Sequence, residues 1–320
     1  MEQMDNNKAI NLEGIFRAIK TYQTARGKTE PNGIVNAFAQ ALKEDQHCLV
    51  LMTKTMKNGK TDKAFVMMKD RQGNDMFPMY TDMEHILPVK QGLEKNNYVE
   101  IGTMNLRMLF QLLSEKQMCN SVIVNPFSQN FATKLNFFMD IVGREPRSHI
   151  TLIEADLAAL YTDAIVCPTD ETISGSGESD KAIQAAGGDV FKAMVDLEVV
   201  EGTLDVADVA VIQCHGDLHA KYIFYTNIPE FSWDATTEDV FECYANCMTA
   251  ARELGCKSIA FPCTSAAMKG MPKEIVIGAA TKAVTTWLLK NPSVNIDVYF
   301  CFDTAEEKEF CQKYFDGMKK

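Results

Sequence analysis

The sequence has no long apolar run, and its first residues carry no export signal. No run approaches the ~18 apolar residues that a membrane-spanning helix needs, so a membrane protein is not expected. Residues 1–7 hold neither a basic nor an apolar segment, and no secretion signal is predicted there. A hydrophobic content of 46% and a charged content of 23% exclude a disordered or collagen-like chain. The length of 320 residues indicates about two domains.

Cysteines are few, and no pattern pairs them. The ten cysteines are far below the density of a disulfide scaffold, and no Cys-x-x-Cys motif occurs. Most stand in apolar runs, as Cys48 does before Leu49, so we expect reduced, buried thiols in a cytoplasmic protein. Cys243 and Cys247 are four residues apart and could share a helix face with a metal. Two thiols make an incomplete zinc site, so neither a metal nor a cofactor is predicted.

Acidic charge is concentrated in the second half of the chain. Residues 1–146 hold 18 basic and 16 acidic side chains, residues 147–320 hold 14 and 27, and the net charge is −11. The sequence has no cluster of basic residues. Binding to DNA or RNA depends on such clusters, because they release counterions from the phosphates. Nucleic acid is therefore not a predicted partner, and neither is a membrane.

The first half of the chain predicts a mixture of helices and short strands. Apolar residues recur at helical spacing over 15–22 and 34–42. The runs 48–52 and 64–68 read as two strands of a hairpin, because Asn58-Gly59 lies between them. Further predicted elements are a strand at 76–80, a helix at 105–115, a strand at 121–126 and a helix at 129–142.

The second half alternates strands with helices, after a break at residues 143–148 where glycine and proline interrupt regular structure. Such alternation favours a mostly parallel sheet covered on both faces, whose ligands bind beyond the carboxyl ends of its strands. We therefore predict an α/β chain of two domains, 1–145 and 148–320. The predicted strands are 149–154, 164–166, 209–213, 221–226, 258–262 and 295–301, and the helices are 178–198, 236–254, 273–290 and 304–318.

Two loops that follow predicted strands of the second half are candidates for anion binding. The loop 172–180 has two glycines separated by a serine (175–177) just before a helix. Glycine lets backbone amides approach an anion, and the first turn of a helix has N–H groups free to bind it. The loop 262–272 combines small residues with a glycine and a proline before the next helix. On their pattern alone, both loops also fit plain strand-to-helix connections.

Segments of the second half resemble, in the same order, those of macro domains, the modules that bind ADP-ribose and related ligands. Residues 150–157 resemble the first strand and its Gly-Asp-Ile-Thr motif, and 162–166 resemble the strand before the Asn-Ala-Ala-Asn loop. Residues 167–183 fit that loop and the Gly-rich start of the next helix without a gap. The run Ala-Lys-Tyr-Ile-Phe-Tyr-Thr at 220–226 resembles the central strand, and 258–274 the late strand with the second phosphate loop.

The resemblance implies a three-layer α/β/α macro domain over residues 148–320 and a role for each matching residue. Asp156, followed by Leu157, stands where the family accepts a hydrogen bond from the adenine amino group. Asp180 stands where hydrolytic members hold an aspartate near the distal ribose, able to orient or activate water; a carboxylate there also suits a helix N-terminus. The residues that would cradle the phosphates are Gly175, Ser176 and Gly177 in the first loop and Ser265, Ala266, Ala267, Met268, Lys269 and Gly270 in the second.

The loops depart from the macro domain pattern. The Asn-Ala-Ala-Asn loop reads Cys-Pro-Thr-Asp at 167–170, so Asp170 replaces the last Asn, which usually touches the distal ribose. Its carboxylate accepts hydrogen bonds but donates none, and it is a second candidate for a catalytic or ligand-binding role. Glu178 adds a further carboxylate beside the predicted anion site. In the second loop Ala267 replaces a glycine and Lys269 replaces an aromatic residue.

The first half resembles the N-terminal domain of SseB-like proteins over residues 33–142. The resemblance rests on the segments 77–82, 105–109 and 122–127. It implies an α/β fold and little defined chemistry. The sequence of this half has no nucleophile–base pair, so we predict an interaction module with an unknown protein partner.

Cys214, His215, Asp217 and His219 follow one another in a metal-like order. A shared helix face would be needed to bring both imidazoles to one ion. In the macro domain resemblance this stretch corresponds to a turn between a strand and a loop. No metal is predicted there.

Three functions remain open from the sequence. In the first, a divergent macro domain binds ADP-ribose, a related nucleotide derivative or an ADP-ribosylated protein, and the N-terminal domain is an interaction module. In the second, a degenerate macro domain serves as a protein-interaction scaffold. In the third, the protein is an ADP-ribosyl hydrolase that uses Asp180, with a contribution from Asp170.

Overall fold

The computed structural model divides the chain into two compact units. Unit 1 comprises Met1–Ile19 and Gly33–Pro146, and unit 2 comprises Lys20–Asn32 and Arg147–Lys320. A short segment of the first half therefore groups with unit 2. The structure describes residues 10–25, 30–57, 60–94, 98–201, 203–229, 237–263 and 271–318.

Unit 1 contains two small sheets. In the first, β1 pairs with β2 and β5 in antiparallel fashion; in the second, the order is β3-β4-β6-β7, with β4 and β6 parallel. The predicted hairpin is confirmed, since Lys57 pairs with Lys60, while Asn58 and Gly59 lie outside the described residues. The elements of the first half of the chain are α1 (Glu13–Thr24), α2 (Asn32–Lys43), β1 (His47–Lys57), β2 (Lys60–Phe65), β3 (Met68–Lys69), β4 (Asp75–Met79), α3 (Met83–Glu94), β5 (Val99–Asn105), α4 (Leu106–Glu115), β6 (Ser121–Val124), β7 (Phe131–Lys134) and α5 (Leu135–Met139).

The predicted helix at 105–115 is confirmed as α4, and its local cause is visible. The Asn105 side chain accepts hydrogen bonds from the amides of Arg107 and Met108, which caps the helix N-terminus. Its buried residues, Leu106, Leu109, Phe110 and Leu113, recur at helical spacing and so form one apolar face.

The predicted helix at 129–142 is wrong. Residues 131–134 form β7, which runs antiparallel to β6, and only the five residues of α5 are helical after it. The cause is the preceding turn, in which Asn125, Phe127 and Asn130 adopt positive φ angles of 48°, 67° and 50°. This backbone reverses the chain and places the next residues beside β6.

Unit 2 is built on a six-stranded sheet of order β10-β11-β9-β12-β13-β8. All neighbours are parallel except β10 and β11. The predicted strands and helices all occur, and α6 bends at Gly188, whose φ of +69° interrupts the helix. The elements are β8 (His149–Glu154), η1 (Leu157–Ala159), β9 (Ala164–Thr169), α6 (Glu178–Glu201), β10 (Val209–Gln213), β11 (Tyr222–Asn227), α7 (Thr237–Glu253), β12 (Ser258–Pro262), α8 (Lys273–Lys290), β13 (Asp297–Phe302) and α9 (Ala305–Met318).

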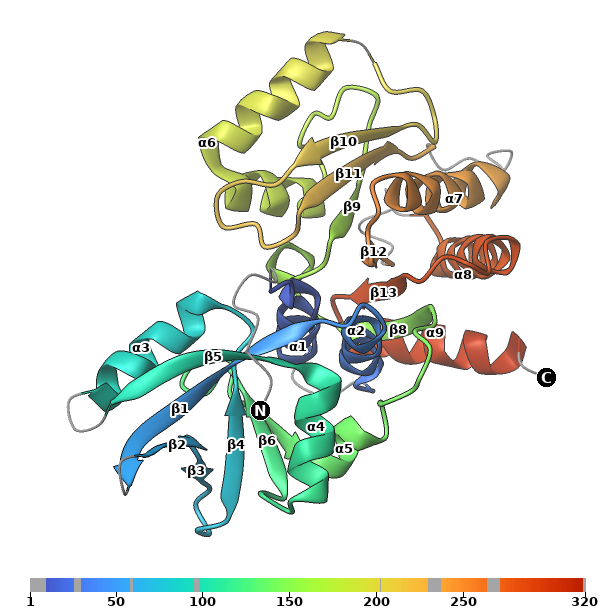
Figure 1. Cartoon of the computed structure of the whole chain (residues 1–320). Coiled ribbons are helices and arrows are strands. Elements are labelled where there is room, and N and C mark those ends of the chain that lie inside the picture. Colours follow the sequence, from blue (N-terminus) through green and yellow to red (C-terminus); the bar gives the residue numbers. More distant parts are fainter. Residues whose placement is uncertain are drawn as a thin grey trace. The chain divides into compact units, whose positions relative to one another are not determined.

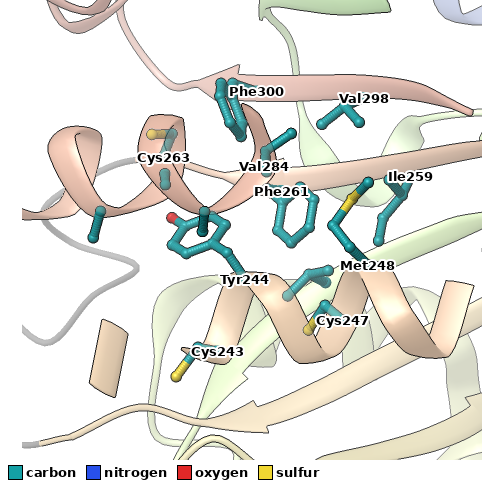
Figure 2. Packing of buried hydrophobic residues seen from close by; sticks show 14 of the residues in the cluster. Cys243, Tyr244, Cys247, Met248, Ile259, Phe261, Cys263, Val284, Val298 and Phe300 are labelled. Carbon is teal, nitrogen blue, oxygen red and sulfur yellow. The ribbon is translucent and has the colours of Figure 1, made fainter. Parts of the chain in front are cut away.

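Helices cover both faces of this sheet, with α6 on one side and α7, α8 and α9 on the other (Figure 1). Alternate strand residues serve the two cores: Ile165 and Cys167 of β9 pack with α6, whereas Val166 packs on the opposite face. Figure 2 shows the second core, where Tyr244 of α7 lies against Phe261 and Phe300 of neighbouring strands. The predicted three-layer α/β/α fold with a mostly parallel sheet is confirmed for the second half.

All ten cysteines lie within the described residues and are free. Nine of them are buried, and Cys214 is half-buried. In the described part of the chain no helix is long and apolar enough to span a membrane.

Candidate functional site

The strands β9 and β12 end at the same edge of the unit 2 sheet. These strands are parallel neighbours, with Ile259 beside Ala164 and Ala260 beside Ile165. Their carboxyl ends therefore point the same way, and the loop after β9 leads directly into α6. The predicted second phosphate loop, Ser265, Ala266, Ala267, Met268, Lys269 and Gly270, lies outside the described residues.

Asp170 follows β9 directly and folds the loop back on itself. Its Oδ1 accepts hydrogen bonds from the amides of Thr172 and Ser174, each at 3.0 Å, and from the Thr172 hydroxyl. Its Oδ2 accepts from the hydroxyls of Ser174 and Ser176. Partial burial opposes the charged form, but the hydrogen bonds from Ser174 and Thr172 outweigh it and lower the pKa of Asp170 to about 2. Asp170 is therefore ionised, and its carboxylate fixes the conformation of its own loop.

The glycines of the loop expose two backbone amides at the start of α6. Gly175 has a φ of +72°, which favours glycine, and its N–H points inward to the carboxylate of Asp180. The next two residues, Ser176 and Gly177, are exposed, and within the described part of the chain their amides make no hydrogen bond. Two unsatisfied N–H groups beside a helix N-terminus, with its partial positive charge, suit an anion.

Asp180 lies in the first turn of α6 and is only 1% exposed. Its carboxylate accepts hydrogen bonds from Thr169 Oγ1 at 3.2 Å, Gly175 N at 3.1 Å and Gln184 Nε2 at 2.9 Å. Burial raises the pKa of Asp180, and the hydrogen bonds, with that from Gln184 the strongest, offset this only in part. Asp170 and Asp180 therefore flank one loop with opposite shifts of pKa.

Asp156 lies after β8, which is separated from β9 in the sheet by the two strands β12 and β13. Its Oδ1 accepts a hydrogen bond from Ala158 N at 3.0 Å and caps the short 3₁₀ helix η1, while the carboxylate itself is exposed. Leu157, beside it, is half-buried and packs against the α6-side core. The predicted adenine contact of these two residues stays a prediction.

Asp303 is a residue of this edge that the sequence analysis missed. It follows β13, whose Phe302 pairs with Glu154 of β8, so it emerges beside the segment that holds Asp156. Burial raises the pKa of Asp303, and the negative charges of Glu178 and Asp156 raise it further. Its position two residues after the predicted strand 295–301 was the available signal. The edge therefore carries exposed amides together with several carboxylates.

The two cysteine and histidine patterns considered for metal binding lie elsewhere and serve packing. His219 stacks on Tyr161, with ring centroids 4.1 Å apart and planes inclined by 13°. Burial raises the pKa of the Cys243 thiol to about 11, and its Sγ lies 3.6 Å from the carbonyl of Asn227. A thiol held in this form is a poor metal ligand. Among the described residues no three His, Cys, Asp or Glu side chains gather as a metal site.

Comparison with known proteins assigns the sequence to a family. Residues 166–280 match the pattern of the Macro domain family. The O-acetyl-ADP-ribose deacetylase 1 of Pantoea vagans is 31% identical over 157 residues, which cover 48% of this chain and 91% of that protein. The chain belongs to the macro domain family. The macro domain lies in unit 2, and the resemblance of residues 33–142 to SseB-like proteins stays a prediction.

Other relatives share the macro domain but not their whole length. The ADP-ribose glycohydrolase MACROD2 of Homo sapiens is 30% identical over 155 residues, covering 48% of this chain and 36% of that protein. An uncharacterised protein of Thermotoga maritima is 30% identical over 169 residues, and the chain spans 28% of its length. Among solved structures, the Oceanobacillus iheyensis macrodomain with MES bound has 20% identity and a TM-score of 0.49, covering 53% of this chain and 91% of that one.

Proposed function

We propose that the macro domain of this protein binds ADP-ribose or a related nucleotide derivative at the edge formed by β9 and α6. The observation that carries the proposal is the pair of exposed, unsatisfied amides of Ser176 and Gly177 at the helix N-terminus. Two relatives are named for chemistry on ADP-ribose or its acetyl ester, and the deacetylase matches over nearly its whole length. A diphosphate has the charge and size for such a cradle.

Binding is better supported than turnover. A general base must have an oxygen free to take a proton from water. Asp180 is buried and already accepts three hydrogen bonds, and Asp170 accepts five from its own loop with a lowered pKa. Hydrolysis by these two residues, the scaffold alternative and the protein partner of the N-terminal half therefore stay predictions.

The test is calorimetric titration of the full chain with ADP-ribose, with AMP and ribose 5-phosphate as comparison ligands. We expect ADP-ribose to bind and the two monophosphates to bind at least about 10-fold more weakly, because each lacks one phosphate of the pair. The absence of both heat and a thermal shift with millimolar ADP-ribose would contradict the proposal.

A matched pair of glycine variants ties binding to the loop. In Gly175→Ala a new Cβ would lie 3.1 Å from Gln184 Nε2 on a backbone with a φ of +72°. In Gly255→Ala the backbone is similarly strained, with a φ of +69°, but the Cβ meets nothing within 4 Å and lies beyond α7. We expect both to lower stability and only Gly175→Ala to weaken ADP-ribose binding, by about 10-fold or more. Equal affinity of the two variants would place the ligand elsewhere.

A further inference from the structure

Asp180 joins three separate parts of the macro domain through one carboxylate. Thr169 belongs to the end of β9, Gly175 to the glycine loop and Gln184 to the second turn of α6, and all three donate to it. With 1% of its surface exposed, the side chain points into the protein. Its hydrogen bonds therefore connect the strand, the loop and the helix.

These hydrogen bonds fix the backbone that presents the proposed anion-binding amides. The Gly175 N–H turns inward to Asp180, and the following amides of Ser176 and Gly177 then remain exposed. A hydrogen bond to an ionised acceptor is roughly twice as strong as a neutral one. Asp170 holds the neighbours Ser174 and Ser176 through their hydroxyls, but the Gly175 amide itself, on a left-handed backbone without a Cβ, donates to Asp180.

From the burial of Asp180 and its three donors, we infer that Asp180 is a positioning residue that sets the affinity for the diphosphate by fixing Gly175. It acts through the loop and does not touch the reacting atoms or activate water. This inference rests on the proposed binding function, and it assigns to Asp180 a role different from the hydrolytic one that the family resemblance implies.

The test compares Asp180→Ala and Asp180→Asn in the full chain. Alanine removes the acceptor, so Gly175 is no longer held, and we expect ADP-ribose binding to weaken by about 10-fold or more. Asparagine keeps an oxygen for the Gly175 amide, and the Gln184 amide can rotate to accommodate the new NH₂ group. We therefore expect Asp180→Asn to bind within about 3-fold of the unmodified protein.

Asp163→Ala is the matched control for loss of a buried carboxylate. Asp163 is 6% exposed, accepts a hydrogen bond from Lys257 N at 2.6 Å and pairs with Lys221 at 3.0 Å. It lies just before β9, at the opposite end of that strand from Thr169. We expect it to lower the thermal midpoint but to leave the affinity for ADP-ribose unchanged, so destabilisation alone would not mimic the Asp180 effect.

A second readout is hydrogen exchange of the loop amides measured by NMR without ligand. We expect the Gly175 amide to exchange faster in Asp180→Ala, by about 10-fold or more, and to stay protected in Asp180→Asn and Asp163→Ala. This readout does not need ligand. If the unmodified protein failed to bind ADP-ribose, the proposed function would fall, and the exchange of Gly175 would still decide whether Asp180 holds the loop.

Two results would overturn the inference. One is Asp180→Ala with unchanged affinity and an unchanged Gly175 exchange rate, which would show that the loop does not depend on the carboxylate. The other is an Asp180→Asn variant that keeps its affinity but loses turnover of an ADP-ribosylated substrate that the unmodified protein cleaves. Such a split between binding and turnover would assign Asp180 to chemistry.

Discussion

Two buried polar networks, one taken from each unit, are built around different chemical groups. In unit 1 the amide of Asn125, fully buried, accepts from Thr81 N at 3.0 Å and donates to Thr81 Oγ1 and Gln129 Oε1. In unit 2 the carboxylate of Asp180 only accepts. An amide donates and accepts, so neutral partners satisfy it, whereas a carboxylate must recruit donors and responds to pH.

The comparison teaches which network is structural and which one reaches a surface. The Asn125 network stays within its own unit: Gln129 in turn donates to the carbonyl of Phe16, and Thr81 Oγ1 donates to Asp82 Oδ2 at 2.7 Å. The Asp180 network reaches Gly175, which is followed by the exposed amides of Ser176 and Gly177. A neutral amide thus holds a turn in unit 1, and a charged carboxylate holds a loop with free donors in unit 2.

The largest expected effect is that of Asn125→Ala. It leaves partners in Thr81 and Gln129 unsatisfied and places alanine at a φ of 48°, so we expect a loss of about 3 kcal/mol in the free energy of unfolding. Because Asn125 carries no charge, and the lowered pKa of Asp82 keeps the carboxylate next to Thr81 ionised, the loss should be the same at pH 5 and pH 8. Urea unfolding at both pH values measures it, with the exposed Asn120→Ala as control. A loss that changes with pH would break the distinction between the networks.

Asp163→Ala should have the second largest effect, a loss of about 2 kcal/mol in the free energy of unfolding. The substitution removes the acceptor for Lys257 N and leaves Lys221 without this partner. Lys221 is 41% exposed and can turn to water, which limits the cost. Thermal unfolding gives the value. A loss below 0.5 kcal/mol would mean that the amino ends of the strands tolerate an unsatisfied amide.

Asp170→Ala should cost about 1 kcal/mol at pH 7, after allowance for solvent screening of a half-buried group. The pKa of Asp170 is lowered from 3.8 to about 2 in the folded state, so its stabilisation is present above pH 3.8 and is lost as the pH falls toward 2. The pKa of Asp180 is raised above 3.8 in the folded state, so the effect of Asp180 has the opposite sign. Its ionisation lowers the stability as the pH rises from 3.8 through the raised pKa. Unfolding of both single variants between pH 3 and 7 separates them; slopes of equal sign would refute the contrast.

His149→Gln should have the smallest effect, about 0.5 kcal/mol, because the pair is partly exposed. His149 Nδ1 lies 3.5 Å from Asp297, and this partner raises the pKa of His149 against the effect of burial. The stabilisation is therefore complete below pH 6.5 and is lost as the pH rises through the raised value. Stability measured at pH 5.5 and 8.5 should differ more in the unmodified protein than in the variant, and equal differences would refute the pairing.

The fold of the second half could largely be predicted from the sequence, because each strand is an apolar run and each helix has regular periodicity. The first half was harder. The helix α3 contains Pro88 and β5 contains Gly102, residues that weaken both patterns, and neither element was predicted. The turn at Asn125 reverses the chain through three left-handed residues, which composition alone does not reveal.

The place of Asp180 in the chain fold was predicted, but not the orientation of its side chain. The sequence places Asp180 in the first turn of a helix after two glycines, and the structure agrees. Whether its carboxylate faces solvent or the interior depends on Thr169 and Gln184, which come from other elements or turns. Asp303 was missed because its neighbourhood is created by the pairing of β13 with β8, a contact across the whole second half.

The order of the unit 2 sheet also bears on how the protein is made. β8 is the first strand of that sheet to be synthesised, and its one partner in the sheet is β13, about 150 residues later. At roughly 5–20 residues per second, a ribosome would keep β8 waiting for about 10–30 seconds before Asp297 emerges. During that interval its edge is open to chaperones or to neighbouring nascent chains. A messenger RNA truncated before codon 297 would release a chain in which β8 never pairs with β13.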